Sequence, residues 1–136
     1  MDVFVYGTLT EPARVGDLLD SFVFVGPATL SGLHLVEGRY PTLAPGGETA
    51  GRLLRTDEVS TLDGYERVDD GFYVRVTVPL DAPDGYPPEA AVYVGEPDRL
   101  DANATWPGAG GFRDRVTDYL SANEVAVRLG DRLTDG

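Results

Sequence analysis

The carboxylate of Glu66 falls in a pattern that places it on the buried face of a short helix. Val59 and Leu62 are spaced i and i+3, and position 66 completes the stripe at i+7. Desolvation raises the pKa of a carboxyl group, and such a group is a competent general base near neutral pH. The alternative is that the helix ends at the preceding glycine and that Glu66 pairs with Arg67 or Arg75 at the surface. The spacing alone leaves both interpretations open.

The second candidate site is the turn Tyr6-Gly7-Thr8-Leu9, which follows a predicted strand at once. Gly7 lets the backbone turn its N–H groups toward a ligand, and the following helix N-terminus adds partial positive charge. Such a turn suits a carboxylate or a developing oxyanion. A plain strand-to-helix turn explains the glycine equally well, because the further glycines or the lysine of a phosphate-binding loop are absent.

Other kinds of site find little support. His34 is the one histidine and cysteine is absent, so we expect no metal site and no thiol nucleophile. His34 alternates with Leu33 and Leu35 on a predicted strand, which indicates a structural or solvent-facing side chain. No serine stands in a Gly-x-Ser-x-Gly setting. The pair Asp69-Asp70 lies in a glycine-flanked turn and is interpreted as part of a solvated loop.

The elements that must position these residues are short and mixed. Alternation and β-branched content predict strands at 3–6, 22–25, 30–36, 50–54, 72–78 and 90–94. Helices are predicted at 11–20, 57–66 and 112–122. We expect Thr10 and Thr56 to cap the first two helices, residues 44–47 to form a loop tip, and residues 124–136 to be a helical turn, a strand or frayed chain. These elements lack a regular βαβ rhythm, which predicts an α+β fold with a mixed sheet or small barrel.

Length and charge bound the remaining expectations. A chain of 136 residues accommodates one domain. Its formal net charge is −12, and all 11 basic residues are arginine. An acidic, lysine-free composition indicates adaptation to a high-salt cytoplasm, where self-repulsion is screened; an ordinary acidic protein is the alternative. This charge repels phosphate backbones and anionic lipid, so we expect neither nucleic acid nor membrane as a partner.

A cytoplasmic location is the remaining expectation from composition. The absence of cysteine suits a reducing compartment. The first residues lack the basic segment and apolar run of a secretory signal. No apolar run approaches the roughly 20 residues of a membrane span.

Several blocks together resemble one family. Val5-Tyr6-Gly7-Thr8-Leu9 resembles the signature of the γ-glutamylcyclotransferase-like superfamily, in its AIG2-like branch. Further blocks follow in the order of that family: Gly38-Arg39-Tyr40-Pro41-Thr42-Leu43, Gly51-Arg52-Leu53, Leu62-Asp63-Gly64-Tyr65-Glu66 and Tyr73-Val74-Arg75. The resemblance covers residues 2–94. One departure is Arg67, which stands where the family commonly has glycine after the catalytic glutamate.

The resemblance implies a small mixed β-barrel of about six strands with about three flanking helices, and no cofactor or metal. It also implies an enzyme that releases 5-oxoproline from a small γ-glutamyl substrate, whose own α-amine attacks its γ-carbonyl. Glu66 would then be the catalytic acid and base, and the backbone of the glycine turn would hold a carboxylate or oxyanion. The substrate-binding residues carried over are Tyr6, Gly7, Thr8, Leu9, Tyr40, Tyr73 and Arg75.

Three hypotheses about function follow. The first is a cyclotransferase acting on a γ-glutamyl amine or peptide. The second is a non-catalytic protein that keeps the same pocket and binds an amino-acid-like ligand, against which Glu66 argues because a buried carboxylate does not help to bind an anion. The third is an acidic interaction module without a pocket, which explains the charge but not the ordered blocks. The region after Gly95 carries no functional signal, and oligomeric state is not predicted.

Overall fold

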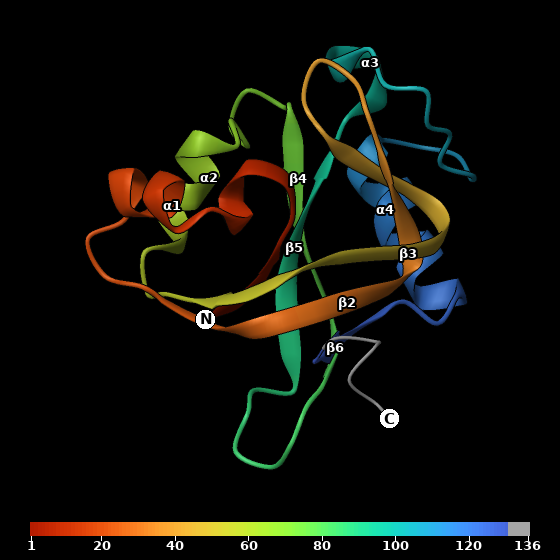
Figure 1. The fold of residues 1–136 in the computed structure, drawn as a ribbon. Coiled ribbons are helices and arrows are strands. Elements are labelled where there is room, and N and C mark those ends of the chain that lie inside the picture. Colours follow the sequence, from red (N-terminus) through yellow and green to blue (C-terminus); the bar gives the residue numbers. More distant parts are fainter. Residues whose placement is uncertain (131–136) are drawn as a thin grey trace.

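The computed structural model describes residues 1–130, apart from the side chain of Thr8. Its centre is a closed barrel with the strand order β1-β3-β2-β6-β4-β5 (Figure 1). The strands are β1 Asp2–Val5, β2 Val23–Val36, β3 Thr42–Arg55, β4 Tyr73–Asp81, β5 Glu89–Gly95 and β6 Ala126–Leu129. The helices are η1 Gly7–Thr10, α1 Pro12–Leu18, α2 Val59–Tyr65, α3 Pro97–Leu100 and α4 Phe112–Ala122. The predicted fold class, a small α+β barrel with flanking helices, is confirmed.

The expectation of separate strands at 22–25 and 30–36 was wrong, because both belong to the long strand β2. The segment between them contains Gly26 and Pro27, which break a regular strand. Here the pairing of β2 with β3 shifts between Phe24 and Gly26, and this bulge lets the strand continue. The final strand β6 completes the barrel beside β2, within the tail whose structure the sequence left open; residues 131–136 lie outside the described part.

The expected loop tip at 44–47 was also wrong. Pro45 lies in β3 and pairs with Leu33 of β2. Gly46 and Gly47, with φ of +97° and +74°, form a bulge opposite Gly32, because the register shifts between Ser31 and Leu33. Glycine tolerates these angles, so the loop-like composition produces a bulge within a strand. The turn between β2 and β3 lies instead at residues 37–41, next to the site described below.

The helix ends differ from the expected caps. The first residue before α1 is Glu11, and the Thr10 hydroxyl instead donates to the Gly7 carbonyl at 2.6 Å. Thr56 Oγ1 accepts the Glu58 N–H at 3.0 Å, one residue before α2 begins. Helix α3 was not predicted, whereas α4 spans the predicted residues 112–122. No helix in the described part is long and apolar enough to cross a membrane.

Strand β1 is buried on both faces and links two apolar layers. Phe4 points into the barrel, where it packs with side chains such as Leu53. Val3 and Val5 point outward, beneath α1 and α2, and pack with Val15 and other side chains of the outer layer. Alternate residues of a strand point to opposite faces, so β1 holds the two helices against the barrel.

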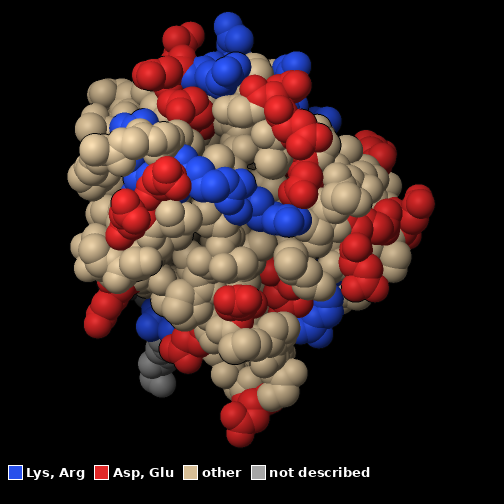
Figure 2. Space-filling view, turned by 180° about the vertical axis from the view of Figure 1, so that it is seen from behind, with Lys and Arg blue, Asp and Glu red and all other residues tan. Residues whose placement is uncertain are grey.

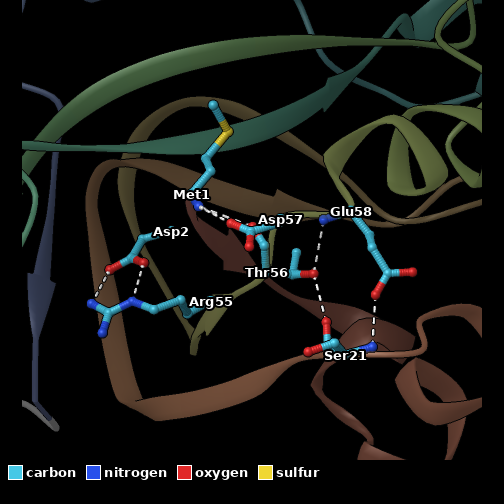
Figure 3. Close-up of polar contacts among 7 residues, drawn as sticks. All are labelled: Met1, Asp2, Ser21, Arg55, Thr56, Asp57 and Glu58. Atoms are coloured by element: carbon cyan, nitrogen blue, oxygen red, sulfur yellow. Dashed lines mark hydrogen bonds and ion pairs between the residues drawn. The ribbon is translucent and has the colours of Figure 1, made fainter.

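A polar network fixes the start of α2 (Figure 3). Arg55 donates to both carboxylate oxygens of Asp2 at 2.7 and 2.9 Å, across the pairing of β1 with β3. Thr56 Oγ1 donates to the Ser21 carbonyl at 2.8 Å, and Ser21 N–H donates to Glu58 Oε2 at 2.6 Å. The connection from β3 into α2 is therefore anchored at one end of the helix. Glu66 follows directly after the other end.

Candidate active site

A pocket of about 400 Å³ lies where β1, β4 and β5 meet α1 and α2. Its walls are largely aromatic, since five of the seven tyrosines of the chain line it. The lining residues are Phe4, Val5, Tyr6, Leu9, Arg14, Tyr40, Pro41, Tyr65, Glu66, Arg67, Phe72, Tyr73 and Tyr93. A concave, mostly apolar cavity with a few polar groups is typical of small-molecule sites.

Glu66 is the one acidic side chain among the described residues that line this pocket. Helix α2 ends at Tyr65, and the Glu66 N–H still donates to the Leu62 carbonyl at 2.9 Å. Glu66 thus lies at the helix terminus with its carboxylate in the pocket. Burial raises the pKa of Glu66 from 4.5 to about 7, because desolvation disfavours the charged form.

The surface ion pair considered for Glu66 does not form. Arg67 Nε lies 3.3 Å from Asp70, and Arg75 Nη1 lies 3.1 Å from Asp63. Within the described part, no hydrogen bond or ion pair engages the Glu66 carboxylate. Helix α2 does end close to Gly64, as the alternative interpretation proposed. The Glu66 carboxylate is nevertheless directed into the pocket. It remains a desolvated, unpaired acid.

Two tyrosine hydroxyls beside Glu66 are held by backbone carbonyls. Tyr6 Oη donates to the Tyr93 carbonyl and Tyr73 Oη to the Pro41 carbonyl, each at 2.6 Å. Burial, followed by neighbouring charges that include Glu66, raises the pKa of Tyr73. Burial also raises the pKa of Tyr6. Both phenols therefore stay neutral, and the Tyr73 oxygen can accept a hydrogen bond from a ligand.

Tyr93 reaches the pocket from β5 and is fixed by a charged pair. Its hydroxyl donates to Asp63 Oδ1 at 2.6 Å, while Asp63 Oδ2 pairs with Arg75. Arg75 and Tyr93 are also direct partners in the pairing of β4 with β5. Arg75 was expected to bind substrate, but it does not line the pocket and lies behind Asp63. In this position it orients Tyr93 through Asp63.

The glycine turn lies at the edge of the pocket. Gly7 has φ of +67°, the left-handed conformation that glycine adopts without strain. It leads into the short helix η1, from which Leu9 lines the pocket. Gly7 itself is not one of the described residues that line the pocket.

Of the expected site residues, the structure therefore brings five into one pocket: Tyr6, Leu9, Tyr40, Glu66 and Tyr73. The residues that sequence reasoning missed are Phe4, Val5, Arg14, Pro41, Tyr65, Arg67, Phe72 and Tyr93. From the sequence, most of them would be interpreted as ordinary core or surface residues of the helix, strand or loop that contains them. Two signals were available: Tyr65 and Arg67 flank Glu66, and Val5, Pro41 and Tyr65 stand in the blocks that resemble the family. Among the residues described, no cluster of His, Cys, Asp or Glu side chains is suited to hold a metal ion.

Comparison with known proteins places this pocket in a family context. Residues 3–111 match the family model described as gamma-glutamyl cyclotransferase, AIG2-like. The chain is 41% identical over 85 residues to AIG2-like protein C of Arabidopsis thaliana, covering 57% of this chain and 48% of that protein. The chain thus spans about half the length of the curated relatives that it matches.

Solved structures share the fold. The solution structure of protein ytfP from Escherichia coli is 28% identical, with a TM-score of 0.56 over 84% of this chain and 99% of that one. A structure described as gamma-glutamyl cyclotransferase has a TM-score of 0.59 over 90% of this chain and 99% of that one, and at 15% identity shows a common fold alone. By the match of residues 3–111, the chain belongs to the γ-glutamyl cyclotransferase, AIG2-like family.

Proposed function

We propose that this protein releases 5-oxoproline from a γ-glutamyl amine or peptide, with Glu66 as the catalytic acid and base. The substrate's α-amine attacks its own γ-carbonyl carbon, the bond to the leaving nitrogen breaks, and a five-membered lactam remains. The two protons that the α-ammonium loses end on the leaving amine, which departs as an ammonium ion. Family membership supports a role of this kind.

One observation carries the proposal: the Glu66 carboxylate is desolvated and unpaired within the described part of the chain. Its pKa of about 7 lets it exist in both protonation states near neutral pH. It can then accept the first proton from the α-ammonium and return it to the leaving nitrogen. A carboxylate already held by an arginine would be too weak a base for this exchange.

The remaining work of catalysis is to fold the substrate back on itself. The nucleophile is already tethered to the carbonyl that it attacks, so a shaped cavity is sufficient to hold the reacting atoms together. The aromatic walls that contain Tyr6, Tyr40 and Tyr73 supply that shape. We assign the γ-glutamyl α-carboxylate to backbone N–H groups of residues 7–9, next to the pocket.

The test is 5-oxoproline release from a panel of γ-glutamyl dipeptides and γ-glutamyl amines. We expect Glu66→Gln, which keeps the size but not the basicity, to lower kcat by about 100-fold or more. The matched control is Glu89→Gln, at an exposed position of β5 outside the pocket, which should keep full activity. Equal rates for Glu66→Gln and the unaltered protein would refute this assignment of the base.

The second candidate is a protein that binds an amino-acid-like ligand in the same pocket without turning it over. The aromatic lining favours it as much as it favours an enzyme, because tyrosine walls serve binding as well as catalysis. Calorimetric titration of the same panel distinguishes the two. Saturable binding with no 5-oxoproline from any compound identifies a binding protein.

A further inference from the structure

The balance of acidic and basic residues in the pocket lining is opposite to that of the whole chain. The whole chain has 23 acidic and 11 basic residues. Among residues 1–130, the pocket lining has one acidic residue, Glu66, and two arginines, Arg14 and Arg67. A local excess of cations inside an acidic surface attracts an anionic group of the ligand. Among the described residues, neither arginine pairs with Glu66, and the carboxylate that Arg67 contacts, Asp70, is not part of the lining.

Arg14 is a cation without a partner. It lies on α1, is exposed and lines the pocket. Among the described residues, none forms a hydrogen bond or ion pair with it, although the chain is rich in carboxylates. Helix α1 lies beside α2, the helix that leads to Glu66 (Figure 1). Arg14 therefore lines the pocket, and no described residue engages its guanidinium.

Arg67 has a left-handed backbone conformation, and its side chain is oriented by two neighbours. Its φ of 55° is in the left-handed region, which glycine adopts freely and which strains a residue with a side chain. The guanidinium lies 4.6 Å over the Phe72 ring, and its Nε lies 3.3 Å from Asp70. This backbone conformation closes the C-terminal end of α2, where the Val68 N–H donates to the Asp63 carbonyl at 3.0 Å and the Arg67 N–H to the Gly64 carbonyl at 3.2 Å. Arg67 is thus a second oriented cation directly after Glu66.

We propose that Arg14 and Arg67 bind the carboxylate of the leaving group, so that the substrate is a γ-glutamyl amino acid or peptide with a free carboxylate beside the scissile amide. This inference rests on the proposed function. The γ-glutamyl α-carboxylate has its own candidate site at the backbone of residues 7–9. The arginines therefore serve a second carboxylate. Guanidinium groups suit it, since they bind carboxylates with paired, charge-assisted hydrogen bonds.

The experiment compares γ-glutamyl-alanine with its C-terminal amide, two compounds that differ in this one charge. Both are assayed for 5-oxoproline release at about 0.1 M salt, where charges about 10 Å apart still interact. We expect the protein to prefer the dipeptide over the amide by about tenfold in kcat/KM, the value of one good charge-assisted contact. In Arg14→Ala and Arg67→Gly this ratio should fall toward one.

The control is Arg128→Ala, which removes the same charge from an exposed position on β6. Arg128 pairs with Asp81, at the other end of β4 from Tyr73. This variant should keep both the activity and the ratio. A ratio that stays high in both pocket variants overturns the proposal. A rate that falls equally for dipeptide and amide also overturns it, because the arginines would then bind the γ-glutamyl part.

If no compound yields 5-oxoproline, the proposed function fails and binding decides the present inference. Calorimetric titration with the same two compounds is then compared between the unaltered protein and Arg14→Ala. Tighter binding of the dipeptide by about tenfold, lost in Arg14→Ala, supports a carboxylate subsite without catalysis. Equal affinity for the two compounds, or no binding of either, overturns it.

Discussion

Tyr93 donates a 2.6 Å hydrogen bond from its hydroxyl to Asp63, one helical turn before the proposed catalytic Glu66. The bond connects a strand of the barrel wall to the helix that carries the acid. Asp63 is held from its other oxygen by Arg75, so three side chains from α2, β4 and β5 lock together. The position of Glu66 thus depends on side chains that do not themselves transfer protons.

Removing this hydroxyl should loosen the site. We expect Tyr93→Phe to lower the free energy of unfolding by about 1–2 kcal/mol, because Asp63 loses a partner in a partly buried place. The loss should also lower kcat, through a less well positioned Glu66. Urea denaturation and 5-oxoproline release measure the two effects. Tyr119→Phe, which removes a hydroxyl on α4 outside the pocket, is the control; an equal loss in both variants would contradict a specific role of Tyr93.

The pKa of Glu66 predicts a pH-dependent stability. Its carboxyl group has a pKa of about 7 in the folded protein against an ordinary 4.5, so the folded state binds the proton more tightly. Stability from this group is complete below pH 4.5 and is lost as pH rises through about 7. Glu66→Gln does not ionise, so it should be the more stable protein at pH 8, by up to about 3 kcal/mol.

Denaturant titrations of Glu66→Gln and the unaltered protein at pH 5, 6, 7 and 8 check this expectation. The difference between the two should widen with pH. A constant difference would mean that Glu66 is not desolvated in solution. Such a result would remove the main observation behind the proposed general base.

The same pKa predicts the pH dependence of the reaction. Glu66 must be ionised to accept the first proton, so kcat/KM should rise by about tenfold per pH unit below its pKa and level off above it. The inflection should lie near pH 7, since burial raises the pKa of Glu66 to about 7. Initial rates of 5-oxoproline release from pH 5 to 9 give the profile. An inflection near 4.5, the ordinary pKa of the group, would indicate a hydrated carboxylate.

Gly7 and Gly16 provide a matched pair of glycine substitutions. Gly7 has φ of +67°, so Gly7→Ala should cost about 1–2 kcal/mol of unfolding free energy through backbone strain. A Cβ there would meet Pro41 Cγ at 3.5 Å, an ordinary contact, so crowding adds little. Gly16→Ala, in α1 with open space around it, should instead stabilise by about 0.5–1 kcal/mol. Thermal melts of both variants check the opposite signs.

Salt should stabilise this protein. Acidic side chains are spread over the face seen in Figure 2, while basic ones form a band across its middle and smaller groups at its top and lower edges. With a net charge of −12, repulsion between carboxylates opposes folding at low ionic strength. The Debye length falls from about 10 Å at 0.1 M to about 3 Å at 1 M, so we expect the Tm to rise by several degrees. A Tm that is constant from about 0.1 to 3 M potassium chloride would contradict adaptation to high salt.

Local pattern determined much of the fold. The alternating segment of β4 and the periodic segment of α4 were predictable, because each shows the repeat of one regular element. The prediction was wrong inside β2 and β3, where glycine and proline were expected to end a strand. There they lie at bulges within continuous strands. A bulge is stabilised by the partner strand, so the sequence of one strand cannot distinguish it from a turn.

The candidate site divides in the same way. Glu66 and Tyr6 could be found from the sequence, because a carboxylate in an apolar stripe and a family motif are both local signals. Tyr93 and Arg14 could not, since each is unremarkable within its own element. Barrel closure places β5 parallel to β1, which brings Tyr93 beside Tyr6, and helix packing brings Arg14 to the same pocket. The sequence by itself thus indicated Glu66 as the acid for the proposed chemistry, through its spacing and the family resemblance together. Only the tertiary structure decided what surrounds that acid, because the surroundings come from strands and helices far apart along the chain.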